Sequence, residues 1–133
     1  MVLKNMSLSH VVIWIDHQEA HVIHFNADAS ESEIITTKSK HTHVHQKGGV
    51  LGSGHSTSDQ SYLHEVIHAV SEANEILVVG PGSAKLELLK HVSKHDAKVS
   101  ERIVGVETVD HPSDRQLLAY AKKYFIKADN LRA

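Results

Sequence analysis

The chain has 133 residues, of which 41% are hydrophobic and 23% are charged, fractions that are typical of folded globular proteins. This length fits one domain, which can bury roughly two-thirds of its unfolded surface without a disulfide or a structural metal. A formal net charge of −2 excludes a protein that coats nucleic acid over its whole surface, because that mode needs an excess of lysine and arginine.

The composition also limits the kinds of site that the chain can build. It has no cysteine, which excludes disulfides, thiolate nucleophiles and cysteine-based zinc motifs, whereas histidine is abundant with 13 residues. A metal would therefore need imidazole and carboxylate ligands. The longest apolar runs, at residues 11–15 and 76–79, are too short to cross a bilayer, and the first residues lack a signal-peptide core. We expect a cytoplasmic protein with no membrane partner.

Three strands are predicted in the first third of the chain. Residues 10–16 and 20–25 are rich in β-branched and aromatic residues, and the polar residues between them predict a hairpin. The first run is almost continuously apolar, which suits a central strand that is covered on both faces. Residues 33–38 are more polar, and we expect this third strand nearer an edge of the sheet.

A helix is predicted next, because apolar residues recur with helical spacing at Leu63, Val66, Ile67 and Val70. Thr57 and Gln60 have the spacing of a capping box, which predicts a helix start just before this stripe. The residues before Thr57 are then expected to form a loop.

The remaining elements alternate between strand and helix. Residues 75–79 predict a buried strand, which ends at Gly80-Pro81-Gly82. Ser83 can cap the helix that follows, and the inward-facing side chains of this helix are expected to be Leu86, Leu89 and Val92. Residues 102–109 predict the last strand. A final helix is expected after Pro112 and should end before Asn130.

This order, βββαβαβα, predicts a single α/β domain with a mixed sheet, helices on its faces and a ribonuclease H-like topology. Sites in such sheets lie at the carboxyl ends of strands, which nominates Asp16, the Gly80 turn and Asp110. Ribonuclease H-like nucleases also need an acid on the fourth strand. Because that strand ends in Val79-Gly80-Pro81, nuclease activity is not expected.

The segment HTHVHQKGGVLGSGH, residues 41–55, combines histidines with glycines and has little that could fill a core. We predict a binding loop formed by His41, His43, His45, Lys47, Gly48, Gly49, Gly52, Gly54 and His55. If the segment is extended, the alternating histidines point to one side, where a metal such as zinc could be bound by His41, His43, His45 and His55. The loop is therefore a candidate contact surface or a candidate metal site.

His64, Glu65 and His68 match the pattern H-E-x-x-H, in which two histidines bind zinc and the glutamate activates water. Glu87 can be nominated as a third ligand. At about 100° per residue, however, both histidines lie on the outer face of their helix, away from the apolar stripe. With so many histidines in the chain, such a match also arises by coincidence.

Two segments of the second half, EILVVGPGSAKLELLKHVSKH and RIVGVETVDHPSDRQLLAYAKKYF, resemble the middle domain of the eukaryotic and archaeal peptide-chain release factor and of Pelota. The chain as a whole, including WIDHQEAHVIHF, GSGH, EILVVGPG and GVETVDHP, resembles small stand-alone bacterial translational machinery proteins. The resemblance covers nearly all of residues 1–133 and implies one domain of this middle-domain type.

The resemblance also implies a role for the loop. In release factors the matching loop carries Gly-Gly-Gln, which positions water on the peptidyl-tRNA ester, whereas here Val50 follows Gly48-Gly49. Pelota-type domains also lack this glutamine and bind stalled ribosomes. We therefore expect a module without peptidyl-tRNA hydrolase activity that binds RNA or the ribosome through the loop and through Lys38, Lys40, Lys47, Lys85, Lys90 and Lys94.

Three alternatives stay open. The chain is this cofactor-free binding module, or a histidine-rich metal-binding protein or zinc-dependent hydrolase that uses the H-E-x-x-H helix, or a housekeeping interaction or stress protein with no nucleic-acid partner. The lysines are equally well explained by ordinary solubility. Nothing in the sequence indicates an oligomeric state.

Overall fold

The computed structural model describes residues 8–37 and 51–132, with side chains described for residues 8–37 and 60–127. The elements are β1 (His10–Ile15), β2 (Glu19–Phe25), β3 (Ser30–Thr36), α3 (Leu51–Ala69), β4 (Glu75–Gly80), α4 (Ala84–His95), α5 (Ala97–Glu101), β5 (Ile103–Thr108) and α6 (Asp114–Arg132). The predicted order of strands and long helices is confirmed over the described ranges. The short helix α5 is an addition to it.

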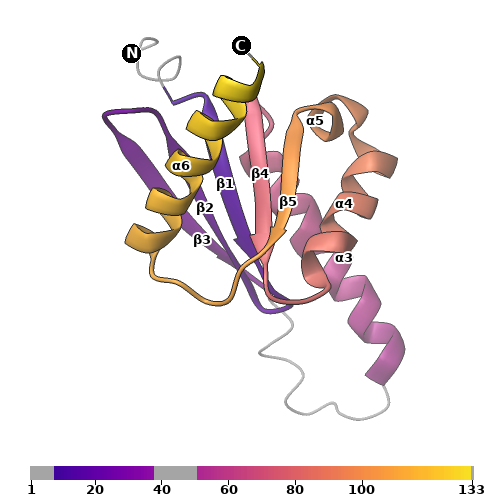
Figure 1. Ribbon diagram of the computed structural model, residues 1–133. Coiled ribbons are helices and arrows are strands. Elements are labelled where there is room, and N and C mark those ends of the chain that lie inside the picture. The colour runs from indigo at the N-terminus through magenta and orange to yellow at the C-terminus, as the bar shows by residue number, and fades with distance from the viewer. Residues whose placement is uncertain (1–7, 38–50, 133) are drawn as a thin grey trace.

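The five strands form one mixed sheet in the order β3-β2-β1-β4-β5 (Figure 1). β1 pairs antiparallel with β2 and parallel with β4, while β5 continues the parallel half. The α/β class, the hairpin and the edge position of β3 are thus confirmed, and the ribonuclease H-like topology stays a prediction. β1 lies in the middle of the sheet, and Val11 to Ile15 are at most 2% exposed. Its continuous apolar run is explained by helices on both faces.

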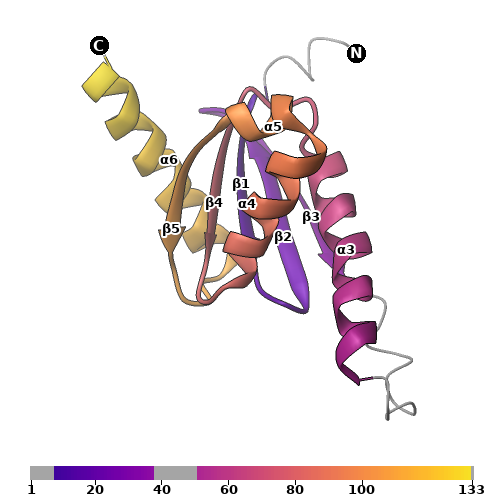
Figure 2. The same cartoon turned by 90° about the vertical axis from the view of Figure 1, so that its right-hand side faces the viewer.

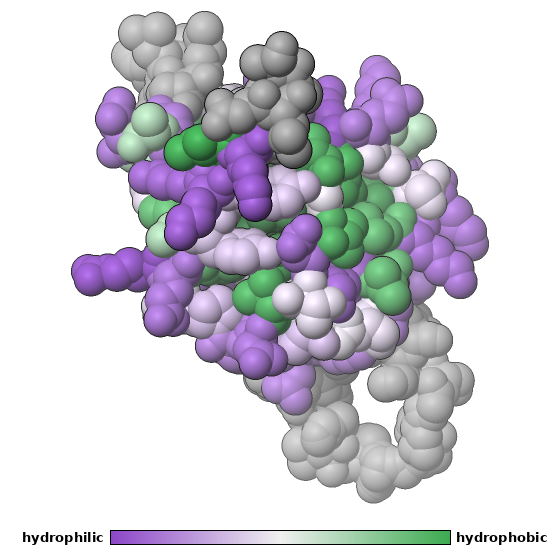
Figure 3. All heavy atoms as spheres, in the orientation of Figure 1, coloured by the Kyte–Doolittle hydropathy of each residue, from purple (hydrophilic) through white to green (hydrophobic). Residues whose placement is uncertain are grey.

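Helices cover both faces of the sheet, with α3, α4 and α5 on one side and α6 on the other (Figure 2). Val11, Ile13 and Ile15 contribute to the core under α3 and α4, and Val12 and Trp14 to the core under α6. This division follows from the two-residue period of a strand. Because α6 is the one described helix on its side, apolar side chains reach the surface beside it (Figure 3), and Val104 of β5 is 38% exposed.

The start predicted for the first helix is wrong. α3 begins at Leu51, so that Thr57 lies inside the helix and does not cap it. Once Leu63 and Val66 anchor the helix to the core, each further residue at its N-terminal end adds one backbone hydrogen bond. Extending a helix in this way is far less unfavourable than nucleating a new one. The predicted inward stripe is confirmed, since Leu63, Val66, Ile67 and Val70 are all buried.

The inward face predicted for the second helix is partly wrong. Leu86 is 56% exposed and Leu89 is half-buried, whereas Ala84, Leu88 and Val92 are buried. The phase of the buried stripe is set by the point at which the helix leaves the Gly80-Pro81-Gly82 turn. Ser83 occupies the N-cap position, but its side chain makes no capping hydrogen bond. The last helix also runs to Arg132, beyond the predicted end.

Two glycines permit close approaches that hold the sheet and α6 together. A Cβ atom on Gly80 would collide with the backbone oxygen of Ile15, where β1 and β4 end side by side. A Cβ atom on Gly105 would collide with the hydroxyl of Tyr124, which packs α6 against β5 and donates a hydrogen bond to the Val104 oxygen at 3.3 Å. Larger residues at either position would have to displace backbone or a packed ring.

Candidate functional site

The parallel strands β1, β4 and β5 end at the same edge of the sheet, which we call the carboxyl edge. Asp16, the Gly80 turn and Asp110 follow these three strand ends, so their predicted positions are confirmed. α3 extends past this edge at its N-terminal end (Figures 1 and 2). Crossovers of this kind place a helix start and several loops around one edge, where open α/β sheets bind their ligands.

Asp16 has a structural role in the hairpin. One of its carboxylate oxygens accepts hydrogen bonds from the backbone N–H groups of Gln18 and Glu19, both at 2.8 Å. Its backbone oxygen accepts a hydrogen bond from the Tyr62 hydroxyl at 3.0 Å, which ties the hairpin to α3. The Thr37 backbone N–H donates to the Gln18 backbone oxygen at 3.0 Å. Thr37, the last described residue before the predicted loop, therefore lies at the carboxyl edge.

Four side chains that the sequence did not single out meet at this edge: Glu19, His21, His111 and Asp114, here named the carboxyl-edge cluster. His21 Nδ1 lies 2.8 Å from a carboxylate oxygen of Asp114, and His21 Nε2 lies 3.0 Å from one of Glu19. His111 Nε2 lies 3.8 Å from the same Glu19 oxygen. His21 thus joins β2 to the first turn of α6.

The two carboxylates determine the charge of His21. Burial alone would lower its pKa, but the hydrogen bonds to Glu19 and Asp114 outweigh burial and raise the pKa above the ordinary value of 6.5. The imidazolium can donate to both carboxylates at once, whereas a neutral ring has one N–H to donate. The rings of His111 and Trp14 are in contact, tilted by 49° with centroids 4.3 Å apart, and Trp14 Nε1 donates to the Asp110 backbone oxygen at 2.6 Å.

Most of the predicted binding loop lies outside the described residues, namely His41, His43, His45, Lys47, Gly48 and Gly49, together with Lys38 and Lys40. The prediction that Gly52, Gly54 and His55 belong to a loop is wrong, because all three lie in α3. The four-histidine metal site needs His41, His43 and His45, so it stays a prediction.

The H-E-x-x-H residues lie as helical geometry predicts. His64, Glu65 and His68 are all exposed on α3. Glu87, the nominated third ligand, instead pairs with His17 of the hairpin, whose Nε2 lies 3.1 Å from its carboxylate. Within the described part of the chain no three histidine, aspartate or glutamate side chains are arranged to hold a metal ion.

His64 instead lies near two histidines of α4, and we name His64, His91 and His95 the α3–α4 histidine cluster. The rings of His64 and His91 have centroids 5.9 Å apart, and those of His91 and His95 are 4.3 Å apart. Burial, followed by the charges of His95, His64 and Lys94, lowers the pKa of His91. The spacing of His91 and His95 was visible in the sequence, but their meeting with His64 depends on how the helices pack.

The lysine prediction for α4 needs one correction. Lys85 is 8% exposed, and its Nζ donates to the Gly82 oxygen at 2.5 Å, so it does not belong to a cationic surface. Its ammonium group is held by the glycine turn that precedes the helix, which satisfies a charge that burial would otherwise leave without a partner. Lys90 and Lys94 are exposed as predicted.

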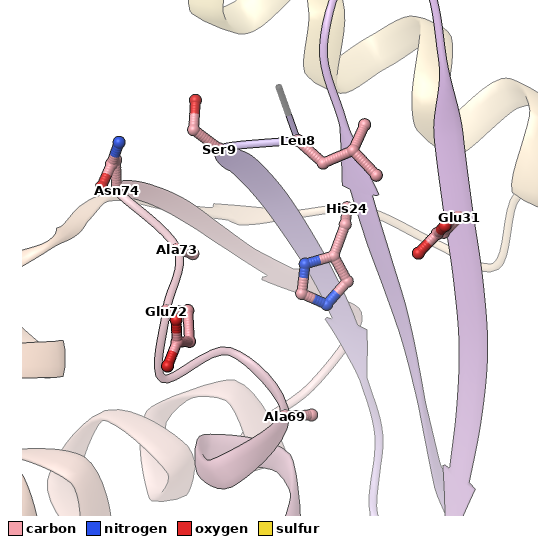
Figure 4. A pocket seen from close by; sticks show the side chains of 8 residues that line it. All are labelled: Leu8, Ser9, His24, Glu31, Ala69, Glu72, Ala73 and Asn74. Carbon is pink, nitrogen blue, oxygen red and sulfur yellow. The ribbon is translucent and has the colours of Figure 1, made fainter. Parts of the chain in front are cut away.

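A hollow of about 730 Å³ lies at the opposite end of the sheet, between the strands that carry His24 and Glu31 and the turn after α3 (Figure 4). It is lined by Leu8, Ser9, His24, Glu31, Ala69, Glu72, Ala73 and Asn74. The charged residues of this lining are two glutamates, which disfavour phosphate. The hollow is therefore not a candidate for nucleic-acid contact.

No helix in the described part of the chain is long and apolar enough to cross a membrane. No protein-family model and no curated protein matches the chain.

Solved structures do share its fold. The chain is similar to the Pelota protein of Thermoplasma acidophilum, with 13% identity and a TM-score of 0.62 over 85% of this chain and 31% of that one. It is similar to Archaeoglobus fulgidus Pelota, with 15% identity and a TM-score of 0.62 over 92% of this chain and 33% of that one. It is also similar to the archaeal translation termination factor aRF1, with 12% identity and a TM-score of 0.56 over 84% of this chain and 34% of that one. The chain thus spans about a third of each of these proteins, and the predicted likeness to the release-factor and Pelota middle domain is confirmed for the fold.

Proposed function

We propose that this chain is a translation-related module of the cytoplasm that binds RNA or the ribosome and does not hydrolyse peptidyl-tRNA. The observation that carries the proposal is the fold, which it shares with two Pelota proteins and a translation termination factor. Those proteins are about three times longer, so the proposal concerns one domain and its contact surface.

The lack of hydrolase activity is proposed from the sequence of the loop. Release factors position the attacking water with the glutamine of Gly-Gly-Gln, and this chain has Val50 after Gly48-Gly49. A valine side chain has no hydrogen-bonding group, so it cannot orient water on an ester. The proposed role is therefore binding.

The proposed contact surface combines the loop with α4 and α5. Thr37, which precedes the loop, is buried at the carboxyl edge, and α3, which follows it, packs on the same face of the sheet as α4. Lys90, Lys94 and Lys98 recur every fourth residue along α4 and α5, and all three are exposed. None of them forms an ion pair with a described carboxylate. Their charges are thus available to phosphates, which bind by releasing counterions.

Co-sedimentation with ribosomes over a range of salt concentrations tests the proposal. We expect binding that weakens as salt rises, and a further loss when Lys47→Ala or a Gly-Ser replacement of residues 41–50 is used. Lys90→Ala/Lys94→Ala should lower the slope of log K against log salt by about 1 for each phosphate contact removed.

A matched control is available on the opposite face. Lys123 and Lys127 are exposed on α6, and Lys123→Ala/Lys127→Ala removes the same charge from the far side of the sheet. We expect this variant to bind as the parent does. Equal losses in both double variants would show that only net charge matters, and no sedimentation of the parent at low salt would end the proposal.

A further inference from the structure

The α3–α4 histidine cluster places a buried imidazole in a contact between two helices. His91 is 7% exposed, and its Nε2 atom is buried with no hydrogen-bond partner among the described residues. His64 of α3 meets it edge-on, with an angle of 88° between the rings, and His95 lies one turn further along α4. A buried nitrogen without a partner costs free energy even when neutral, and a buried imidazolium without an acceptor costs more.

The groups that act on His91 electrostatically are all cationic or become cationic. They are His64 from α3, and Lys94 and His95 from α4. The carboxylates described on the same two helices are Glu65 and Glu87, and neither is among the groups that shift the pKa of His91. Glu87 is paired with His17 of the hairpin at 3.1 Å. A proton added to His91 therefore meets cationic neighbours, and no carboxylate is among the described groups that act on it.

We propose that protonation of the α3–α4 histidine cluster separates α3 from α4, so that this contact opens as the pH falls below neutrality. The positive charges that His64, His91 and His95 carry when protonated repel one another across and along the contact. A proton on His91 is tolerated once water reaches Nε2, which requires the two helices to part. The contact thus responds to pH over the range in which histidine titrates.

The direction of the effect follows from linkage. The pKa of His91 is lowered in the folded protein, so the unfolded or opened chain binds more protons as the pH falls through 6.5. The stability that His91 contributes is present above pH 6.5 and is lost below it. Each unit by which the folded pKa is lowered corresponds to about a tenfold change in the opening equilibrium.

A metal ion is a less suitable occupant of this cluster. The rings of His91 and His95 are tilted by 37° with centroids 4.3 Å apart. Among the described residues, no three histidine, aspartate or glutamate side chains are arranged to hold a metal ion. The inference also does not depend on RNA or ribosome binding, because it concerns the contact between α3 and α4. If α3 opens, however, the part of α3 that extends past the carboxyl edge changes its position (Figure 2).

Hydrogen exchange of the α3 amides at residues 62–69 tests the inference on the full chain. After correction for intrinsic rates, we expect exchange in the parent to be faster at pH 5.5 than at pH 7.5, by up to about tenfold. His91→Gln should remove most of this difference, because glutamine does not titrate and only the repulsion between His64 and His95 remains. His68→Gln, on the exposed side of the same helix, should retain it. Equal exchange at both pH values in the parent, or loss of the difference in His68→Gln, would overturn the inference.

Two further measurements keep the test decisive if His91→Gln does not fold. His64→Gln/His95→Gln retains His91 and should reduce the difference in exchange, and an undiminished difference would contradict the proposed repulsion. One equivalent of Zn²⁺ at pH 7.5 should leave exchange of α3 unchanged. Stoichiometric zinc binding that protects α3 and is lost in His64→Gln/His95→Gln would assign the cluster to metal and end the proton-driven opening.

Discussion

The two histidine clusters each place a histidine among charged neighbours, and these neighbours carry opposite charges in the two clusters. In the carboxyl-edge cluster, His21 lies between the carboxylates of Glu19 and Asp114 at 3.0 and 2.8 Å. In the α3–α4 histidine cluster, His91 lies among His64, His95 and Lys94. Both rings lose hydration, so burial acts on both in the same direction.

At His21 the neighbouring carboxylates reverse the direction of the pKa shift that burial would cause, whereas at His91 burial and the neighbouring cations both lower the pKa. The pKa of His21 is raised, so its stabilising effect is fully present below pH 6.5 and is lost as the pH rises through its folded pKa. The pKa of His91 is lowered, so its effect is lost as the pH falls below 6.5. A fall in pH is thus expected to tighten the link between β2 and α6 while it weakens the contact between α3 and α4.

The largest change is expected when the carboxyl-edge cluster loses both acids. Glu19→Gln/Asp114→Asn removes two charge-assisted hydrogen bonds from His21, and we expect a loss of about 1 to 2 kcal/mol in the free energy of unfolding at pH 6, after allowance for partial exposure. The loss should be smaller at pH 8.5, where the parent ring approaches neutrality. Urea unfolding at both pH values measures it, and a loss that grows with pH would contradict the assignment.

The next largest effect is expected from His91→Leu, which replaces a buried ring that has an unpartnered nitrogen. We expect it to stabilise the protein by about 1 kcal/mol at pH 7.5 and by more at pH 5.5, because leucine has no polar atom to desolvate and does not titrate. Thermal or urea unfolding checks this, with exposed His68→Leu as the control. Destabilisation by His91→Leu at both pH values would mean that the buried Nε2 is satisfied in solution.

The smallest effect is expected from His64→Gln. His64 ranks after burial and after His95 as a cause of the lowered His91 pKa, so removing it should raise that pKa slightly. A titration of the ring protons of His91 by NMR, in the parent and in the variant, measures the change. A decrease would show that His64 acts on His91 by something other than charge.

Local patterns predicted those features that depend on neighbouring residues. The apolar run of β1 indicated a central strand, and Leu63, Val66, Ile67 and Val70 indicated the buried face of α3. The inward face of α4 was predicted less well, because Leu86 turns outward when the helix begins at Ala84. A small shift in the start of a helix rotates every later side chain.

The clusters themselves depend on contacts between distant residues. His21 and Asp114 are 93 residues apart, and they meet because the segment that follows β5 brings the first turn of α6 to the start of β2. His64 meets His91 only when α3 packs beside α4. The sequence spacing of His64 and His68 suggested a metal site, but both residues lie on the exposed side of α3. The packing of α3 against α4 instead pairs His64 with His91.

A single NMR titration of all histidine rings in the parent protein, from pH 5 to pH 8.5, tests the comparison most directly. The account predicts that His21 titrates above 6.5 and His91 below it. If both pKa values lie on the same side of 6.5, or in the reverse order, then the neighbouring charges do not separate the pKa values of the two histidines and the account is contradicted.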